Sequence, residues 1–220
     1  MKFLTAFVHA AAASQLVFNN PASWSDYKQS FPFFSNRTWA MQFRTPSLGA
    51  YANDPAIVAI STLTLDHFNF AVEINENITA GASVWLEPKL CPSVNDSPKC
   101  DQPIATSRIP IDDKVDILNI QWTPDSPIIV KPSTTYWFAL RSSSETFSTS
   151  ARWLAGDNWI SSANDPVGDV RMAYIKTDIK QTTVLPRSDS SFTASLQVNA
   201  TYYVRGELLL PPAKVWDLDY

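Results

Sequence analysis

The chain has 220 residues, of which 45% are hydrophobic and only 17% charged, a composition typical of a folded domain rather than a disordered chain. Its formal net charge is −4 and its Lys and Arg residues form no cluster, which argues against binding to nucleic acid or to an anionic membrane surface. No segment is long and apolar enough to span a bilayer, so membrane insertion is not expected. The length suits one large all-β domain.

Residues 1–14 have the features of a secretory signal peptide. Lys2 supplies a positive start, residues 3–12 form an apolar core, and Ala11 to Ala13 provide small residues for cleavage. The alternative, a first strand or helix of the fold, is disfavoured because the run is short, alanine-rich and terminal. The protein is therefore expected to be secreted and extracellular, at a cell wall or surface, although the tail at residues 211–220 lacks the hydrophobic stretch of a lipid anchor.

An aromatic-rich lead-in at residues 15–38 has no clear period, and we expect an edge strand followed by a loop there. A β-sandwich domain is expected over residues 39–210. The region 57–74 shows the longest alternation of apolar and polar residues. Its apolar positions move from odd to even numbers at Asp66 and His67, which predicts a bulge or turn at that point.

Residues 134–140 contain two Thr, three aromatic residues and a Leu, as expected of a half-buried central strand. Tyr136, Phe138 and Leu140 are expected on the core face, with Trp137 and Arg141 on the opposite face. Further strands are expected at 39–43, 82–87, 104–109, 115–122, 147–160, 170–176, 191–198 and 202–210. About ten to twelve short strands without a helical stripe predict an all-β, two-sheet antiparallel sandwich of jelly-roll type.

Cys91 and Cys100 are the only cysteines, so a secreted chain can pair them in one way. The residues between them favour turns, and we predict a disulfide at the neck of a surface loop. Four Asn-x-Ser/Thr sequons predict a glycoprotein with exposed acceptor sites. These acceptors are Asn36, Asn77, Asn95 and Asn199.

The order of several segments resembles the choice-of-anchor R domain, a β-sandwich module of exported and surface-attached proteins. The segments are 39–43, 60–65, 82–88, 103–106, 122–124 and 132–140, within a region of similarity that covers residues 39–159. The family's middle strand follows a Thr-Thr-Tyr-Trp theme, which stands here at residues 134–137. The resemblance implies export and surface attachment, and it brings no catalytic residues. The chain departs from the family in its two cysteines and in lacking a C-terminal anchor segment.

Catalytic patterns are weak. His67 is the only histidine after the signal segment, and the sequence contains no Gly-x-Ser-x-Gly motif for a nucleophilic serine. A paired-carboxylate site for glycoside hydrolysis would need two acids about 5–10 Å apart. The densest acidic cluster, at Asp112, Asp113 and Asp116, has the spacing of a solvated loop. An enzyme is therefore not expected.

Metal chemistry is also restricted. One His and a disulfide do not make a transition-metal site. Calcium needs only oxygen ligands, and Asp157, Asp165 and Asp169 lie in loops rich in Asn, Asp and Gly. These residue types are also ordinary turn formers. No cofactor is expected, with a structural calcium ion as the alternative.

Carbohydrate binding is a more specific functional hypothesis than a general structural role, because sugar rings stack on exposed aromatic side chains. The chain has eight Trp, and the candidate stacking residues are Trp85, Trp137, Trp153 and Trp159. The competing interpretation places them in the core or across strand faces. The prediction is thus a secreted, non-catalytic structural, adhesion or recognition protein whose partner is an extracellular glycan or cell-surface component. The first alternative is a carbohydrate-binding module with exposed Trp or Tyr, and the second is a secreted glycan-active hydrolase.

Overall fold

The computed structural model describes residues 15–22, 30–46, 60–74, 84–111, 117–146, 150–156, 161–162, 170–185 and 193–204. In these ranges every regular element is a β-strand, and the strands pair antiparallel in two sheets. The predicted all-β sandwich is confirmed. The described residues form sixteen strands, more than the ten to twelve expected, because seven of them are only two or three residues long.

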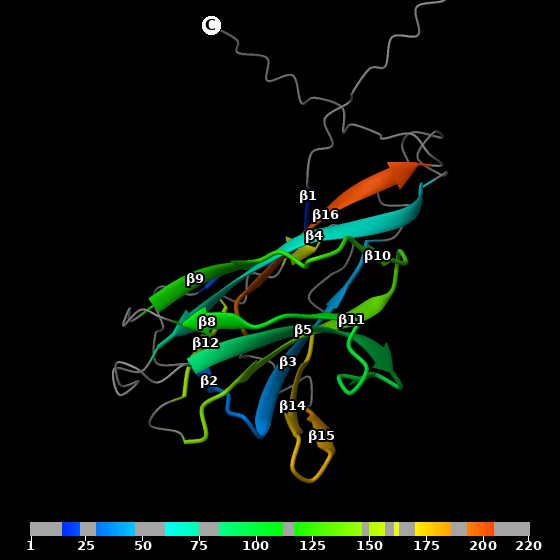
Figure 1. The fold of residues 1–220 in the computed structure, drawn as a ribbon. Coiled ribbons are helices and arrows are strands. Elements are labelled where there is room, and N and C mark those ends of the chain that lie inside the picture. Colours follow the sequence, from blue (N-terminus) through cyan, green and yellow to red (C-terminus); the bar gives the residue numbers. More distant parts are fainter. Residues whose placement is uncertain are drawn as a thin grey trace, which may run out of the picture.

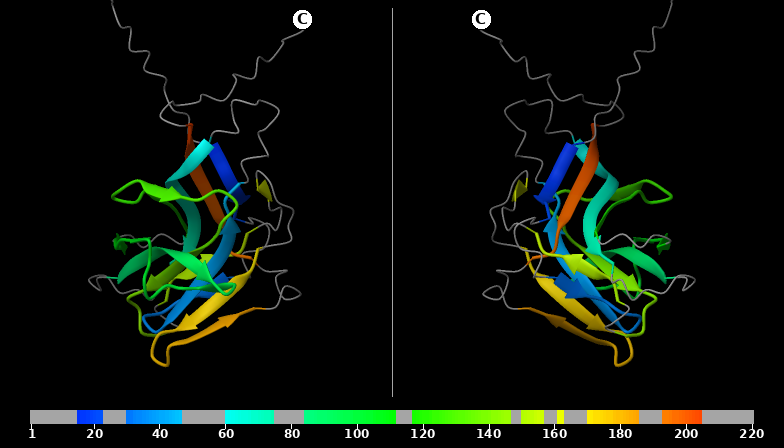
Figure 2. Two further views of the ribbon diagram at one scale, coloured as in Figure 1. Left: turned by 90° about the vertical axis from the view of Figure 1, so that its right-hand side faces the viewer. Right: turned by 90° about the vertical axis from the view of Figure 1, so that its left-hand side faces the viewer.

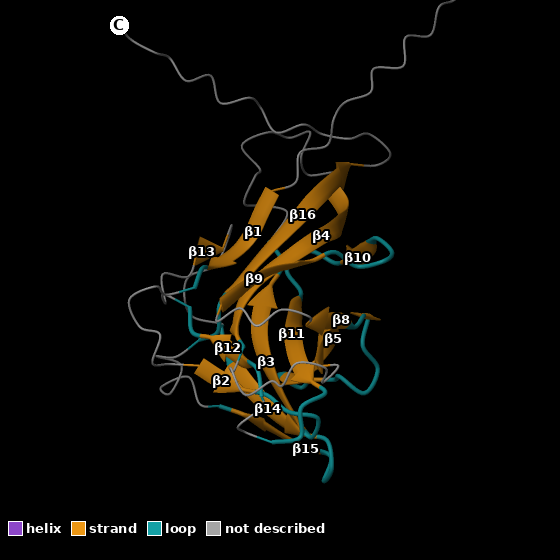
Figure 3. Cartoon of the chain, turned by 60° about the vertical axis from the view of Figure 1, so that its left-hand side comes forward, coloured by secondary structure: helices purple, strands orange, loops and turns teal. Residues whose placement is uncertain are grey.

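Sheet one is built on β4 (Ile60–Glu73), the longest strand. β16 (Leu196–Val204) and then β12 (Arg152–Leu154) pair along one edge of β4, and β10 (Ile128–Val130) and β9 (Ile117–Trp122) pair along the other. The remaining members are β1 (Gln15–Asn20) beside β16, β13 (Ser161–Ser162) beside β1, and β2 (Ser30–Pro32) beside β12. Figure 3 shows β1, β16 and β4 side by side.

Sheet two has β11 (Thr135–Ser142) in its interior, between β3 (Arg37–Arg44) and β5 (Val84–Val94). The central strand predicted at 134–140 is therefore confirmed. β14 (Met172–Lys176) and β15 (Gln181–Val184) extend the sheet beyond β3. On the other side, β6 (Ser97–Pro98), β7 (Ala105–Thr106) and β8 (Ile109–Ile111) pair with β5.

The two sheets lie face to face, with β1, β16, β4 and β9 above β3, β5, β11 and β14 in Figure 1. The chain changes sheet repeatedly, from β3 to β4, β5, β9, β11, β12, β14 and β16 in turn. This alternation is the connectivity of a jelly-roll type sandwich. Some consecutive strands stay in one sheet. Among them are β9 and β10 in sheet one and the β14–β15 hairpin in sheet two, which is seen from both sides in Figure 2.

The bulge predicted in residues 57–74 is present. In the pairing of β4 with β16, Asn199 faces His67 but Ala200 faces Leu65, so Asp66 is the extra residue. Because the bulge moves the register by one, Leu65 before it and Phe68 after it both point into the core. The Thr201 hydroxyl donates a 2.7 Å hydrogen bond to the Asp66 carboxylate and fixes the bulged residue.

The core between the sheets is centred on Phe138 of β11. Its ring stacks on Phe68 of sheet one, with centroids 5.2 Å apart, and packs edge-on against Trp153 at 5.6 Å. Phe70 and Trp122 complete its aromatic surroundings at 5.3 and 5.9 Å. The even-numbered positions of the central strand therefore face the core, as predicted.

Some boundaries differ from the sequence-based prediction. β5 continues to Val94 instead of ending at residue 87, because Leu90 still packs into the core. β16 is one continuous strand where two were expected, and β15 was not expected at all. Residues 15–20 of the lead-in form β1 inside sheet one.

Candidate functional site

Two of the four candidate stacking residues are buried. Trp137 and Trp153 are both 0% exposed. Trp153 belongs to the main core and donates a hydrogen bond to the carbonyl of Ser195 at 2.7 Å. A side chain without accessible surface has no face for a sugar ring, so the prediction of stacking at these two positions is wrong.

Trp137 lies on the outer face of sheet two, as predicted, but this part of the face is covered. A row of alanines, Ala173, Ala40 and Ala139, crosses β14, β3 and β11 in direct register and leaves room for the indole. Cys91 stands directly opposite Trp137 in the ladder, and Cys100 and Val184 pack against the same cluster. Small neighbours below and the disulfide beside it thus enclose the ring.

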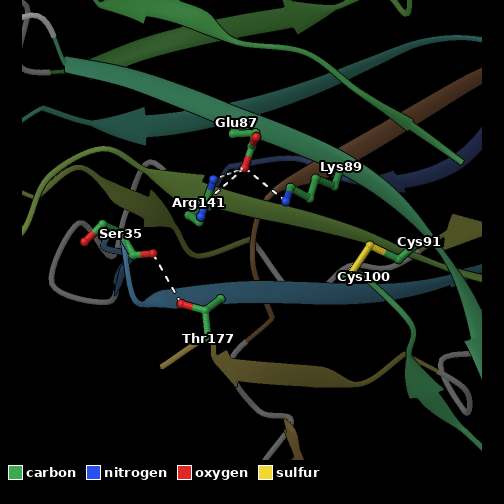
Figure 4. Close-up of polar contacts among 7 residues, drawn as sticks. All are labelled: Ser35, Glu87, Lys89, Cys91, Cys100, Arg141 and Thr177. Atoms are coloured by element: carbon green, nitrogen blue, oxygen red, sulfur yellow. Dashed lines mark hydrogen bonds and ion pairs between the residues drawn. A yellow bond between two sulfur atoms is a disulfide. The ribbon is translucent and has the colours of Figure 1, made fainter. Parts of the chain in front are cut away.

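Cys91 and Cys100 form the predicted disulfide, shown in Figure 4. The disulfide closes the base of an exposed β5–β6 hairpin, since Cys91 lies within β5 and Cys100 follows β6. Asn95 and Asp96 at the tip have φ angles of 50° and 57°, as a two-residue hairpin turn of type I′ requires. The hairpin brings Cys100 against the Trp137 cluster.

Trp85 is half-buried and is surrounded by charged groups. The guanidinium carbons of Arg108 and Arg141 lie 4.4 and 5.5 Å from its ring centroid, within cation–π range. Arg141 and Lys89 both bind the Glu87 carboxylate, at 2.7 and 3.0 Å (Figure 4). The π surface of Trp85 is thus engaged by the protein's own cations.

Several predicted positions fall outside the described residues. These are Trp159, the calcium candidates Asp157, Asp165 and Asp169, the acidic cluster Asp112, Asp113 and Asp116, the sequon at Asn77, and the segments 1–14 and 211–220. In the parts of the chain that are described, no group of three or more His, Cys, Asp or Glu side chains is placed to hold a metal ion. The same parts contain no helix with the length and apolarity to cross a membrane.

The other sequons differ in exposure. Asn36 lies exposed in the turn before β3, and Asn95 lies exposed at the tip of the β5–β6 hairpin. Asn199 is half-buried in the middle of β16, opposite His67. Asn36 and Asn95 therefore offer the access that a glycan needs, and Asn199 offers less.

One carboxylate in the described residues has a shifted pKa. The hydrogen bond from Lys99 lowers the pKa of Asp101 below its ordinary value of 3.8, and the two side chains lie 2.9 Å apart. Both are exposed, on either side of Cys100 in the sequence. An exposed ion pair of this kind is typical of a solvated loop.

The outer face of sheet one carries a row of carboxamide side chains, which we call the amide row: Asn19, Gln197, Asn69 and Gln121. Asn19 of β1 faces Gln197 of β16, Gln197 faces Asn69 of β4, and Asn69 faces Gln121 of β9. Each row member follows or precedes a core residue in its own strand, which directs the amide outward. Four neighbouring strands therefore present the same functional group in one line.

A hollow of about 430 Å³ lies over this face. Its lining includes Gln197, Asn69 and Gln121 of the amide row and also Asn119, two residues before Gln121. The small buried residues Ala71 and Ser195 make the depression, since neither fills the space between the amides. The Ser195 hydroxyl accepts a hydrogen bond from the Ala71 amide at 3.1 Å, so it is held down against β4.

The two ends of the amide row differ in their hydrogen bonding. Gln197 donates a 2.8 Å hydrogen bond to the Asn19 side chain, which fixes this end. Among the described residues, no side chain or backbone group hydrogen-bonds to the side chains of Asn69, Asn119 or Gln121. The end of the row on β4 and β9 therefore presents uncharged hydrogen-bond donors and acceptors that are free to bind a ligand.

The amide row was missed from the sequence. Asn and Gln at alternating positions mark each strand's outer face, and this signal is visible at Asn69 and at Asn119 and Gln121. Their alignment depends on the register of four strands from distant parts of the chain, which no local pattern reveals.

The fold and the amide row together define an antiparallel β-sandwich whose sheet one carries uncharged amides beside a hollow on its outer face. No family model and no curated protein sequence matches the chain. Two similar solved structures come from cowpea mosaic virus: an empty virus-like particle seen by electron cryo-microscopy, and the naturally occurring empty particles of the top component. The first has 10% identity and a TM-score of 0.25 over 95% of this chain and 90% of that chain. The second has 10% identity and a TM-score of 0.24 over 95% and 97%. Scores this low carry no inference about function or assembly.

Proposed function

We propose that this chain is a non-catalytic recognition module that binds a neutral, hydroxyl-rich ligand, a glycan, on the outer face of sheet one. The observation that carries the proposal is the amide row with its adjoining hollow. A carboxamide donates through its nitrogen and accepts through its oxygen, and a sugar hydroxyl does both as well. Free amides in register therefore match the donors and acceptors of a sugar.

Binding is favoured over hydrolysis by the chemistry of the lining. The described residues that line the hollow contribute amides, a hydroxyl and apolar groups. Glycoside hydrolysis needs a pair of carboxyl groups at the scissile bond. Glu73, two residues beyond Ala71 in β4, is 3.8 Å from Arg152 and so has a cationic partner.

A glycan on this face would be held by hydrogen bonds and not by aromatic stacking. Trp137 and Trp153 are buried, and Trp85 already contacts Arg108 and Arg141. Hydrogen bonds from amides take the place of stacking, and such bonds contribute only about 0.5–1.5 kcal/mol each. We therefore expect weak binding to a single sugar, with useful affinity only from several contacts.

We also propose that the protein acts outside the cell, in line with its N-terminal segment and its resemblance to exported sandwich domains. The Cys91–Cys100 disulfide supports an oxidising compartment. A fusion of residues 1–14 to a reporter enzyme tests export. Reporter activity in the medium is expected, and retention inside the cell counts against this localisation.

A glycan microarray of plant, fungal and animal polysaccharides tests the binding function. The wild-type protein is compared with the double variant Asn69→Ala/Gln121→Ala and with Gln181→Ala, which removes an exposed amide from β15 in sheet two. We expect retention on at least one neutral polysaccharide, loss in the double variant, and no change in the control. Silence across the array, or binding that the double variant retains, contradicts the proposal.

A further inference from the structure

The amide row extends across the strands, not along them. Three steps between neighbouring strands, at about 4.8 Å each, give a row roughly 14 Å long. Along the strand direction the run of uncharged, outward-facing residues on β4 is shorter. His67 lies two residues before Asn69, and Glu73 with Arg152 lies four residues after it. The outward-facing residues between these ionisable groups are Asn69 and Ala71, whose positions on the strand are about 7 Å apart at 3.4 Å per residue.

Resting on the proposed function, we propose that the ligand is an extended neutral oligosaccharide that lies across β16, β4 and β9, with successive sugar units facing Gln197, Asn69 and Gln121. The step between strands is comparable with the length that one sugar ring adds to an extended chain. Each unit therefore meets one carboxamide. Asn119, which lines the same hollow, adds a further donor and acceptor at the β9 end.

The two ends of the amide row have different roles in this arrangement. The hydrogen bond between Gln197 and Asn19 holds the Gln197 side chain in place before any ligand arrives. Asn69 and Gln121 have no such bond among the described residues and are free to engage hydroxyl groups. Recognition is thus concentrated at the centre and the β9 end of the row.

An extended peptide is the less suitable occupant. Peptides that bind sheets usually add as a strand at a free edge, using main-chain hydrogen bonds. The amide row lies on a sheet face, and β4 is paired on both edges, with β16 opposite Asn69 on one side and β9 on the other. Only side-chain groups are available there, which favours a ligand that is itself a dense array of hydroxyls.

The test is calorimetric titration of the full chain with cello-, laminari-, manno- and fully N-acetylated chito-oligosaccharides of one to six units. We expect affinity in at least one series to rise with length and to level off at about three or four units. Each amide lost removes about one hydrogen-bonded contact, so Asn69→Ala and Gln121→Ala should each weaken binding of the hexasaccharide about two- to tenfold. Gln121→Ala should also shift the plateau to a shorter oligosaccharide, whereas Gln181→Ala should change neither value.

The outcomes separate this inference from the proposed function. If binding depends on Asn69 but is equally strong for short and long oligosaccharides, the site binds a single sugar unit. That result overturns the arrangement across the strands and leaves the proposed glycan binding intact. Binding that neither variant alters overturns the amide row as the site. If none of the hexasaccharides binds and the polysaccharide array is also silent, the proposed function fails and this inference fails with it. Circular dichroism of each variant verifies that the fold is retained.

Discussion

Gly156 lies directly against the side-chain amide of Asn20, at the edge of sheet one. A Cβ at residue 156 would overlap the Asn20 amide nitrogen, carbon and oxygen. Asn20 is not free to move away, because its Nδ2 donates to the Thr193 hydroxyl at 2.9 Å and to the Ala194 carbonyl at 2.7 Å. A glycine is thus needed for packing at this position.

Gly156→Ala is therefore expected to destabilise the protein by about 1–3 kcal/mol, the usual cost of overpacking. Urea denaturation followed by fluorescence measures the change in the free energy of unfolding. In an Asn20→Ala background the same substitution should cost less, because the clashing amide is gone. Equal costs in the two backgrounds would show that the contact does not determine the requirement for glycine.

Trp137 and Trp85 point to the same outer face of sheet two but have different environments. Trp137 is fully buried over the alanine row, and its Nε1 donates to the Ser93 hydroxyl at 3.1 Å. Trp85 is only half-buried.

Trp137→Ala should cost about 3–5 kcal/mol in unfolding free energy, as for other buried aromatic residues. Thermal and urea denaturation check this, and Trp85→Ala, with a clearly smaller loss, is the matched control. A stability unchanged by Trp137→Ala would mean that the indole is not part of a core.

The disulfide at the base of the β5–β6 hairpin packs against Trp137. Replacing both cysteines, Cys91→Ala/Cys100→Ala, should lower the free energy of unfolding by about 2–3 kcal/mol in the chain-entropy model for so short a loop. Urea denaturation measures the loss, and circular dichroism verifies that the variant keeps the native fold. Intact mass before and after reduction of the wild type should differ by two hydrogens. No mass difference would exclude the disulfide in the purified protein.

Individual strands were largely predictable because the two-residue alternation is a local property. The bulge at Asp66, the orientation of Phe138 and the central place of residues 134–140 all followed from alternating patterns. The burial of Trp137 did not follow, since it depends on Ala40 and Ala173 in other strands and on the folded-back hairpin. A pattern within one strand shows that a residue faces outward and does not show what covers it.

The amide row belongs to a higher level of organisation than any single strand. Asn19 and Gln197 are paired although they are 178 residues apart in the sequence. Asn69 and Gln121 are aligned with them only through the registers of β4 with β16 and β9. A slip of one residue in either register would point the partner amide into the core. The candidate site is thus a consequence of topology, and only its amide-rich composition was visible beforehand.

At the level of the whole molecule, the two outer faces differ in chemistry. Sheet two is closed by Trp137, the disulfide and the charged group of Glu87, Lys89 and Arg141. Sheet one presents a hollow with uncharged amides. The function proposed above therefore assigns the ligand to the outer face of sheet one, because the corresponding face of sheet two carries charged groups and the covered Trp137.

The most direct test of that placement is a ¹⁵N NMR titration of the full chain with an equimolar mixture of cello-, laminari-, manno- and fully N-acetylated chitohexaose. Side-chain amide signals report on each carboxamide separately. We predict that the signals of Asn69, Gln121 and Asn119 shift together and saturate, while that of Gln181 on sheet two stays in place. Shifts confined to sheet two, or no shifts at all, would contradict the placement of the ligand on sheet one.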